Sequence, residues 1–403
     1  MSGFFRVRHA NIVFGALALT VPFCVAQAKA SSEKVLYAFV RDFEGAGDGA
    51  IPSAGLVSDK DGNLYGTTLG GGEDGEGTVF ELSPDGSETI LHSFTGGKDG
   101  YSPEAGLIID EAGNLYGTTT VGGLSGNNGT VFKIAPNGME TVLYVFTGQE
   151  DGGKPMAGLI ADDAGNLYGT TYQGGDKKNG VVFKLAPDGT ETVLHSFKGG
   201  SDGAFPKAGL IADRHGNLYG TTSAGGSTDN GVVFKLASNG TETVLHSFAL
   251  DGVDGANPTG ELIADRDGNL YGTTQSGGGG SSHCQPGINC GTVFKIASDG
   301  TESVLYSFAG GKNDGRQPAS RLIADKDGNL YGTTLFGGQK NEGTVFKLAP
   351  DGTKTVLHSF DKRVDHDGAY PSGPLLADAK FRHLYGETSQ GGHKQGVVYM
   401  VRT

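Results

Sequence analysis

The amino-acid sequence predicts an all-β fold, a seven-bladed β-propeller, from three observations. The first is a recurring stretch that reads Leu-Tyr-Gly, with its tyrosines at Tyr65, Tyr116, Tyr168, Tyr219, Tyr271, Tyr331 and Tyr385. The spacings between these tyrosines are 51, 52, 51, 52, 60 and 54 residues, a period typical of stacked supersecondary units. The second is a set of short β runs between Asp-Gly or Asn-Gly turns, and the third is a strand count that closes a ring.

Each repeat contains four short runs with strand character, which we name strands A to D. In the third repeat they are residues 158–162, 166–171, 181–185 and 192–197. Tight turns at 163–165 and 187–189 join A to B and C to D. Four strands in about fifty residues is the unit of a propeller blade.

The two ends of the chain complete one another. The last repeat ends in a strand C at residues 397–401, without a strand D of its own. Residues 34–39 match the pattern of strand D at 192–197. We therefore predict that 34–39 complete blade seven and that residues 31–403 form a single propeller domain, because closure removes the exposed edges of an open array.

Residues 1–30 have the character of a signal peptide. Arg6 and Arg8 give a basic start, residues 12–26 are mostly apolar, and Ala28 and Ala30 are small residues suited to cleavage. The apolar part is short for a membrane span, so we expect no transmembrane segment in the mature protein. We expect an exported monomer, periplasmic or secreted.

The charge balance excludes one class of partner. Loss of residues 1–30 removes Arg6, Arg8 and Lys29 and no acid, which moves the formal net charge from −14 to −17. Such a surface repels phosphate backbones, so no nucleic-acid ligand is expected. The 72 glycines follow no Gly-X-Y period and accompany a persistent apolar pattern, which excludes a collagen-like or disordered chain.

The recurring motifs carry a family resemblance. Gly291-Thr292-Val293-Phe294-Lys295-Ile296 and its counterpart at 343–348 alternate in order with the Asn-Leu-Tyr-Gly-Thr-Thr stretches. This pattern resembles the GloVer tandem-repeat proteins, a family of bacterial exported repeat proteins, over residues 34–402. The resemblance implies an exported β-propeller and no particular reaction.

The alternation of strand directions separates two faces of the propeller. The A–B and C–D connections share one face and are tight turns. The B–C and D–A connections share the opposite face and are long, and variable loops on a rigid scaffold are where binding sites occur. We expect this long-loop face to carry the function.

Seven aspartates recur in the D–A connections, each four residues before a proline: Asp48, Asp99, Asp151, Asp202, Asp254, Asp314 and Asp367. One interpretation is a turn set by Asp-Gly and stiffened by proline. The other is a ring of carboxylates that faces the central channel or its rim and attracts cations or basic ligands. The two interpretations are compatible.

Other polar residues that repeat have plainer explanations. The first aspartate of each A–B turn, such as Asp59 and Asp110, suggests calcium, but the third turn position changes to Ala112 and an Asx-type turn explains it more simply. The strand-D histidines, such as His92 and His195, alternate with tyrosines in other blades, which indicates packing. In an oxidising compartment, Cys284 and Cys290 are expected to form a disulfide, and a metal site with His283 is the alternative.

Blade seven departs most from the repeat. Glu387 replaces the first threonine of Gly-Thr-Thr, and His366 and His393 lie in neighbouring long loops. An acid and two imidazoles on one rim would suit metal binding or acid–base chemistry, and drift in the closing blade is the alternative.

The leading hypothesis is a non-enzymatic propeller that binds a glycan, peptide or protein through its long-loop face. The alternative is a propeller lyase or hydrolase that uses Glu387, His366 and His393 on the blade-seven rim, with or without a metal. A structural matrix component is a third hypothesis. No cofactor is predicted, and a divalent cation is left open.

Overall fold

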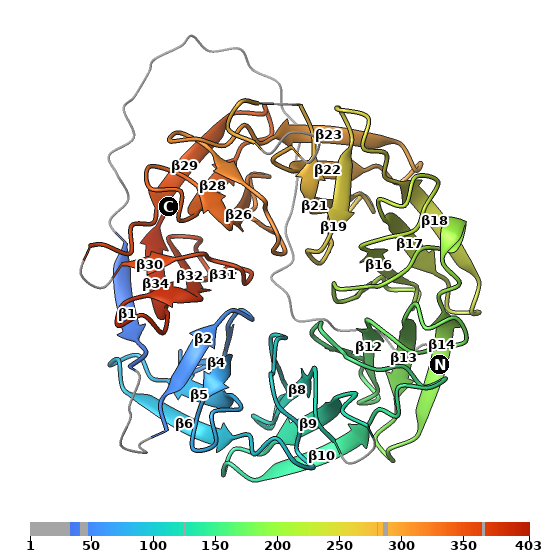
Figure 1. Ribbon diagram of the computed structural model, residues 1–403, viewed down its shortest axis with the longest axis vertical. Helices are drawn as coiled ribbons and strands as arrows, with labels where there is room; N and C mark the ends of the chain where they lie inside the picture. The colour runs from blue at the N-terminus through green and yellow to red at the C-terminus, as the bar shows by residue number, and fades with distance from the viewer. Residues whose placement is uncertain (1–32, 41–46, 124–125, 280, 285–288, 365–366) are drawn as a thin grey trace.

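The computed structural model describes residues 33–40, 47–123, 126–279, 281–284, 289–364 and 367–403. These residues form seven antiparallel blade sheets arranged in a ring, with one edge of each toward the centre, and two additional two-stranded sheets (Figure 1). The predicted seven-bladed propeller is therefore confirmed. The predicted signal peptide, residues 1–30, lies outside the described residues.

The two inner strands of every blade come from the Leu-Tyr-Gly half of the repeat. The innermost strands A are β3 (Val57–Ser58), β7 (Ile108–Ile109), β11 (Ile160–Ala161), β15 (Ile211–Ala212), β20 (Ile263–Ala264), β25 (Ile323–Ala324) and β31 (Leu376–Ala377). Strands B are β4 (Leu64–Gly71), β8 (Leu115–Thr119), β12 (Leu167–Thr171), β16 (Leu218–Thr222), β21 (Leu270–Gly277), β26 (Leu330–Thr334) and β32 (His383–Thr388).

The two outer strands follow from the second half of the repeat. Strands C are β5 (Thr78–Leu82), β9 (Thr130–Ile134), β13 (Val181–Leu185), β17 (Val232–Leu236), β22 (Thr292–Ile296), β28 (Thr344–Leu348) and β34 (Val397–Arg402). Strands D, the outermost, are β6 (Glu88–Ser93), β10 (Glu140–Val145), β14 (Glu191–Ser196), β18 (Glu242–Ser247), β23 (Glu302–Ser307), β29 (Lys354–Ser359) and β1 (Lys34–Ala38).

The ring closes as predicted. The N-terminal strand β1 pairs antiparallel with the C-terminal strand β34, with Lys34 opposite Met400 and Ala38 opposite Val397. The sheet order β1-β34-β32-β31 makes β1 the outermost strand of blade seven (Figure 1). The two ends of the chain thus share one blade, and no blade of the ring lacks a fourth strand.

Edge-to-face aromatic pairs join neighbouring blades. The phenylalanine that follows each strand D packs against the strand-C aromatic ring of the next blade; Phe39–Phe80 and Phe360–Tyr399 are examples, with ring centroids 5.2 and 5.0 Å apart. All four rings are fully buried. A Cβ at Gly66, the glycine of the Leu-Tyr-Gly stretch, would lie 2.6 Å from the Phe80 ring, which explains a glycine in the middle of strand B.

The repeated tyrosines are held by the aspartates of the A–B turns. In blade one, the carboxylate of Asp59 accepts hydrogen bonds from the backbone N–H of Asp61 and Asn63, from Asn63 Nδ2, and from Tyr65 Oη at 3.1 Å. Burial alone would raise the pKa of Asp59, but these bonds outweigh it and hold the pKa below its usual value. The Asx-type turn is therefore correct, and it leaves no free lone pair for calcium.

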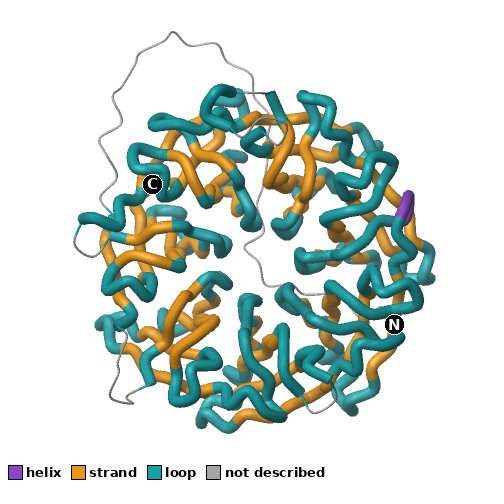
Figure 2. The backbone as a smooth tube through the Cα atoms, viewed as in Figure 1, coloured by secondary structure: helices purple, strands orange, loops and turns teal. Residues whose placement is uncertain are grey.

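Because neighbouring strands of a blade are antiparallel, the long B–C and D–A connections lie on the face opposite these turns. Seen down the axis, loops extend toward the centre of the ring (Figure 2). Short strands order some of them, namely β2 (Gly49–Pro52), β19 (Gly255–Pro258), β24 (Gly315–Arg316), β27 (Phe336–Gly337), β30 (Gly368–Ala369) and β33 (Gln390–Gly391). A 3-10 turn, η1 (Gly200–Asp202), orders another. Within the described ranges, no helix has the length and apolarity needed to span a membrane.

Candidate functional site

The D–A aspartates lie at the outer edge of the propeller, which corrects the prediction of a ring around the channel. Each carboxylate binds the strand-D histidine or tyrosine of its own blade, as Asp48 binds Tyr37, Asp151 binds Tyr144 and Asp254 binds His246. It also accepts the backbone N–H of the second residue after strand D, as Asp151 does from Thr147 at 2.8 Å. These contacts hold the carboxylate beside the outermost strand and away from the axis. The turn interpretation describes these residues better.

A second acidic residue meets each of these aspartates from the following blade. Strand D opens with a glutamate in five blades, Glu33 precedes β1 in blade seven, and Lys354 takes this place in blade six. We call each grouping of a D–A aspartate, its histidine or tyrosine and this opening residue a seam cluster. Burial first, and the neighbouring aspartate second, raise the pKa of Glu88, Glu140, Glu191 and Glu242 to about 7.

These opening glutamates escaped the sequence analysis. A glutamate at the start of an outer strand suggests solvent, yet one oxygen of each is buried without a hydrogen-bond partner among the described residues: Glu33, Glu88, Glu140, Glu191, Glu242 and Glu302. Their repetition in the sequence could have revealed them. It is interrupted once, by Lys354, whose ammonium pairs with Asp314.

The residue before each D–A proline has a left-handed backbone conformation. These residues are Ile51, Ser102, Lys154, Phe205, Asn257, Gln317 and Tyr370, with φ between 53° and 60°. None is glycine and no two are alike, although a left-handed φ costs an ordinary side chain about 1–2 kcal/mol. We call these seven positions the display positions.

The scaffold imposes this conformation through the backbone. The N–H of each display position donates to a carbonyl in the B–C loop of the preceding blade, as Ile51 does to Gln395 at 2.8 Å and Phe205 does to Asn179 at 2.8 Å. Strained backbone that the surroundings fix, combined with a side chain that varies between blades, is typical of functional positions.

Replacing Ile51 by Asn is expected to raise the free energy of unfolding by about 1 kcal/mol. Asn tolerates a left-handed φ far better than a β-branched residue does, and Ile51 is 41% exposed, so little packing is lost. Equilibrium denaturation in urea measures the change. Asn257→Ile, the reverse substitution at the matching position of blade five, should lower the stability by a similar amount. A neutral result for both would show that the conformation is unstrained.

The residues after each D–A proline line the central channel. A cavity of about 190 Å³ is bounded by residues 53–57, 104–108, 156–160, 207–209, 259–261, 319–321 and 372–374, one segment from every blade. The first residue of each segment also differs between blades in most cases: Ser53, Glu104, Met156, Lys207, Thr259, Ala319 and Ser372. The variable residues of the repeat therefore gather at the channel and around it.

Opposite charges meet inside the channel. Arg321 Nη1 donates to Glu261 Oε2 at 3.1 Å, and both side chains are about one-quarter exposed or less. Glu261 extends toward blade four, where a Cβ at Gly209 would lie 2.3 Å from its Oε1. Burial raises the pKa of Glu104, and a hydrogen bond from Thr120 and the charge of Lys207 partly oppose this shift. The channel thus offers carboxylates and cations together.

Aromatic side chains on the same face are covered by cations. Tyr172 packs on the display residue Phe205 with ring centroids 5.2 Å apart, and Lys207 Nζ lies 5.5 Å above the Tyr172 ring. In blade seven, Lys362 Nζ lies 4.9 Å from the centre of the Tyr370 ring and donates to its hydroxyl. The contact of Lys207 with Tyr172 is a cation–π interaction at the rim of the face.

The blade-seven residues do not assemble an acid–base site among the described residues. Glu387 is fully buried between blades seven and one, where its Oε2 accepts the Gly55 N–H at 2.9 Å. Burial raises its pKa to about 8 despite this bond. His393 is exposed on the loop after β33, and His366 lies outside the described residues. At the matching position of blade one, the Thr67 hydroxyl donates to backbone carbonyls of the next blade, whereas Glu387 accepts a backbone N–H.

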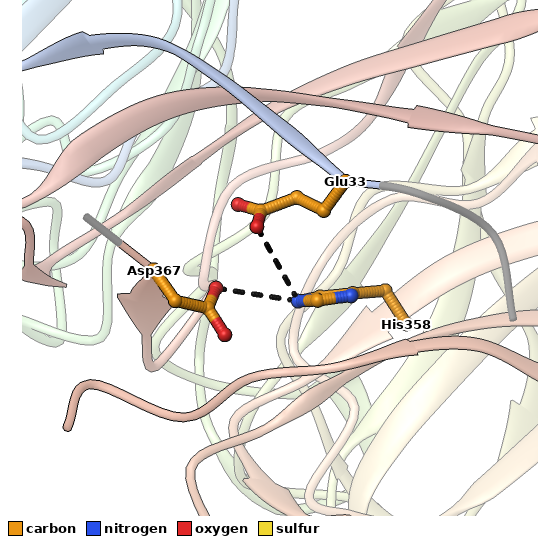
Figure 3. Close-up of side chains that lie close together, drawn as sticks. All are labelled: Glu33, His358 and Asp367. Carbon is orange, nitrogen blue, oxygen red and sulfur yellow. Dashed lines mark hydrogen bonds and ion pairs between the residues drawn. The ribbon is translucent and has the colours of Figure 1, made fainter. Parts of the chain in front are cut away.

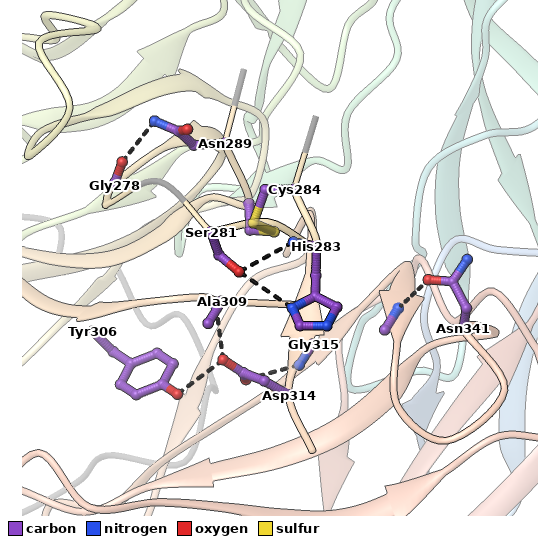
Figure 4. The surroundings of a disulfide bond; sticks show 12 residues. Gly278, Ser281, His283, Cys284, Asn289, Tyr306, Ala309, Asp314, Gly315 and Asn341 are labelled. Carbon is purple, nitrogen blue, oxygen red and sulfur yellow. Dashed lines mark hydrogen bonds between the residues drawn. A yellow bond between two sulfur atoms is a disulfide. The ribbon is translucent and has the colours of Figure 1, made fainter. Parts of the chain in front are cut away.

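Cys284 and Cys290 form a disulfide in the enlarged B–C loop of blade five, with Cα atoms 5.3 Å apart (Figure 4). Nearby, the N–H of His283 donates to Ser281 Oγ at 3.2 Å, and Asn289 Nδ2 donates to the Gly278 carbonyl. His283 is exposed and belongs to neither group of three metal-ligating side chains found in the described part of the chain.

A family model described as the Gloeobacter/Verrucomicrobia repeat matches residues 27–214, 120–285 and 279–403. The chain belongs to this repeat family. No curated protein matches this Gloeobacter/Verrucomicrobia repeat protein.

Several solved structures are similar to this Gloeobacter/Verrucomicrobia repeat protein. A streptogramin B lyase structure aligns with TM-score 0.58 and 13% identity, over 93% of this chain and 99% of the other. The extracellular domain of a putative one-component system from B. thetaiotaomicron aligns with TM-score 0.57 and 13% identity, over 92% and 42%. An oligogalacturonate lyase in complex with manganese aligns with TM-score 0.54 and 11% identity, over 92% and 97%. At these identities the similarity concerns the fold alone.

Proposed function

We propose that this protein is an exported, non-enzymatic propeller that binds an extended peptide segment of a partner protein on its long-loop face. The observation that carries the proposal is the set of seven display positions. Every one holds a non-glycine residue at a φ that glycine would adopt without strain, and every one holds a different residue. A repeat that served the scaffold alone would gain stability by placing glycine or asparagine at these positions.

The chemistry of the face favours a peptide over a glycan. Side chains around the channel include the Glu261–Arg321 ion pair, Lys207 and Glu104, which offer both signs of charge to backbone and side-chain groups. A sugar stacks on an open aromatic face, but Lys207 Nζ already lies over the Tyr172 ring, and Lys362 binds the hydroxyl of Tyr370. Aromatic and arginine side chains are the residues that most often anchor protein partners.

Export is supported by the disulfide between Cys284 and Cys290, because such bonds persist in oxidising compartments. The absence of an enzymatic role is part of the proposal. Glu387 is fully buried against blade one and accepts the Gly55 N–H, so its position does not support the lyase or hydrolase hypothesis.

Selection of peptides from a displayed random library tests the proposal. Peptides that bind the wild-type protein are measured again on Phe205→Ala, Lys207→Ala and Arg321→Ala, with Arg214→Ala on the tight-turn face as the matched control. We expect Kd to rise at least tenfold in the three long-loop-face variants and to stay unchanged in the control. Equal loss in the control variant, or failure to select any peptide, would contradict the proposal. If glycans bind and their binding depends on the same three residues, the ligand would be a glycan and not a peptide.

A further inference from the structure

The seam cluster at the ring closure brings an imidazole and two carboxylates together. His358 Nε2, on β29 of blade six, lies 3.3 Å from Asp367 Oδ1 and 3.8 Å from Glu33 Oε2 (Figure 3). Glu33 immediately precedes β1, the strand that closes blade seven. One ligand atom from each residue falls within 4.8 Å of the others. The cluster therefore joins the N-terminal end of the domain to blade six.

These side chains are buried and held in place, and one buried oxygen lacks a partner. The exposed fractions of the His358, Glu33 and Asp367 side chains are 15%, 11% and 9%. Backbone N–H groups of Gly368 and Asp361 donate to the two oxygens of Asp367 at 2.7 and 2.8 Å, which orients the carboxylate. Glu33 Oε1 is buried and has no hydrogen-bond partner within the described ranges. A buried polar atom without a partner requires an explanation.

In blade six, the chain itself supplies a cation to the seam cluster. There Lys354 stands in place of the opening glutamate, and its ammonium binds Asp314 with the two side chains only 6% and 9% exposed. Tyr306 and the Ala309 N–H contact the same carboxylate, as in the other seam clusters. The chain thus places a cation beside the buried aspartate at this seam. In the seam cluster at the ring closure and in the one between blades four and five, a second carboxyl group takes the place of that cation.

We propose that Glu33, His358 and Asp367 bind one divalent transition-metal ion of the zinc class. A nitrogen and two carboxylate oxygens are donors that Zn²⁺ prefers, at bond lengths of about 2.0–2.2 Å. Ligand atoms in a tetrahedral site are then about 3.3 Å apart, close to the His358–Asp367 separation in the structure. Water would complete the coordination. The ion would fasten β1 to blade six and so lock the closed ring.

The seam between blades four and five offers an independent copy of the same donors. His246 Nε2 lies 3.0 Å from Asp254 Oδ2, and Glu302 brings its ligand oxygen within 4.8 Å of both. Glu302 Oε1 is also buried without a partner among the described residues. A second ion is expected there, remote from the chain ends, so the two sites can be separated by substitution.

Metal titration of the untagged protein tests the proposal. The protein is treated with chelator, dialysed, and titrated with Co²⁺ followed by Zn²⁺; bound metal is measured by mass spectrometry and the Co²⁺ site by visible absorption. We expect Glu33→Gln and His358→Gln each to remove one ion per chain, with at least a tenfold loss of affinity at that site. His246→Gln should remove the other ion and leave the closure site intact.

A second readout guards against variants that merely unfold. Zn²⁺ should raise the Tm of the chelated protein, and this rise should shrink in His358→Gln while its chelated Tm stays near that of the chelated wild type. Tyr306→Phe, at the seam where Lys354 already supplies the cation, is the control and should leave metal content unchanged. Wild-type protein that binds no Co²⁺ or Zn²⁺, or a stoichiometry that His358→Gln does not alter, would overturn the assignment.

Discussion

Raising the pH from about 5.5 to 8.5 is expected to lower the free energy of unfolding by roughly 4 kcal/mol. Four seam glutamates carry this effect: Glu88, Glu140, Glu191 and Glu242. An unfolded glutamate titrates near 4.5, whereas burial and the adjacent aspartate raise the pKa of each of these to about 7 in the folded protein. The folded state therefore binds more protons than the unfolded state between these values. The stability that protonation provides is complete below pH 4.5 and is lost as the pH rises through 7.

The size of the effect follows from the shifts after allowance for solvent. One pKa unit corresponds to about 1.4 kcal/mol, but these side chains are only partly buried, so we assign about 1 kcal/mol to each seam.

Aspartates of the A–B turns, such as Asp59 and Asp325, change the stability with pH in the opposite direction. Burial alone would raise their pKa, but hydrogen bonds from Asn63 and Asn329 outweigh it and lower the pKa below the usual value. Their contribution is lost only as the pH falls below about 4, so maximum stability is expected near pH 5.

Urea denaturation at several pH values, in buffer with chelator, measures this profile. Glu191→Gln should reduce the loss of stability between pH 5.5 and 8.5 by about 1 kcal/mol, because an amide cannot titrate. Asp85→Asn, at an exposed turn outside the seams, is the control and should leave this part of the profile unchanged. A stability that stays constant or increases up to pH 8.5 would contradict the prediction.

The propeller itself could be predicted because the repeat encodes the neighbour of every strand. The absence of a strand D after residues 397–401 and the strand-D pattern at 34–39 determined how the ring closes, and β1 pairs with β34 accordingly. The Asx-type turn was equally accessible, because Asp59, Asn63 and Tyr65 lie within one short hairpin. The sequence is therefore sufficient to predict a contact when the contacting residues are close together in the chain.

The radial position of the D–A aspartates was not accessible in the same way. A repeat shows that Asp48 and Asp254 are equivalent, but it does not show whether their side chains face the axis or the outer strand. Their partners, such as His246, belong to strand D and are separated from them by a long loop. The residue that faces them from the next blade, such as Glu302, is more distant still in the sequence. Contacts across blade boundaries decide these environments.

The display positions also escaped prediction for a physical reason. A residue before proline is normally extended, since the proline ring disfavours other conformations. Ile51 and Phe205 are nevertheless left-handed, because hydrogen bonds from the preceding blade hold their N–H groups. Tertiary contacts therefore override the local preference at the positions where the repeat varies most.

Replacing Lys354 by Glu is expected to lower the free energy of unfolding by about 3 kcal/mol at pH 8 and by much less at pH 5. Lys354 and Asp314 form an ion pair with both side chains less than one-tenth exposed, and breaking such a pair typically costs about 3–5 kcal/mol. The substitution converts the blade-six seam into the arrangement of the other blades. At pH 5 the new carboxyl group would be protonated, as burial beside an aspartate raises the pKa of Glu191 to about 7. The repulsion then disappears, and the carboxyl O–H can donate to Asp314 in place of the lost ammonium.

Blade three provides the matched reverse experiment. Its seam has the same tyrosine–aspartate contact, with Tyr144 Oη 3.1 Å from Asp151 Oδ2, compared with 3.0 Å between Tyr306 and Asp314. Glu191→Lys should therefore stabilise the protein at pH 8, by about 1 kcal/mol, because an ammonium replaces a carboxylate beside Asp151. Denaturation of both variants at pH 5 and pH 8 measures the two effects. If Lys354→Glu were equally destabilising at both pH values, the loss would come from packing, and the seams of blades three and six would not be equivalent.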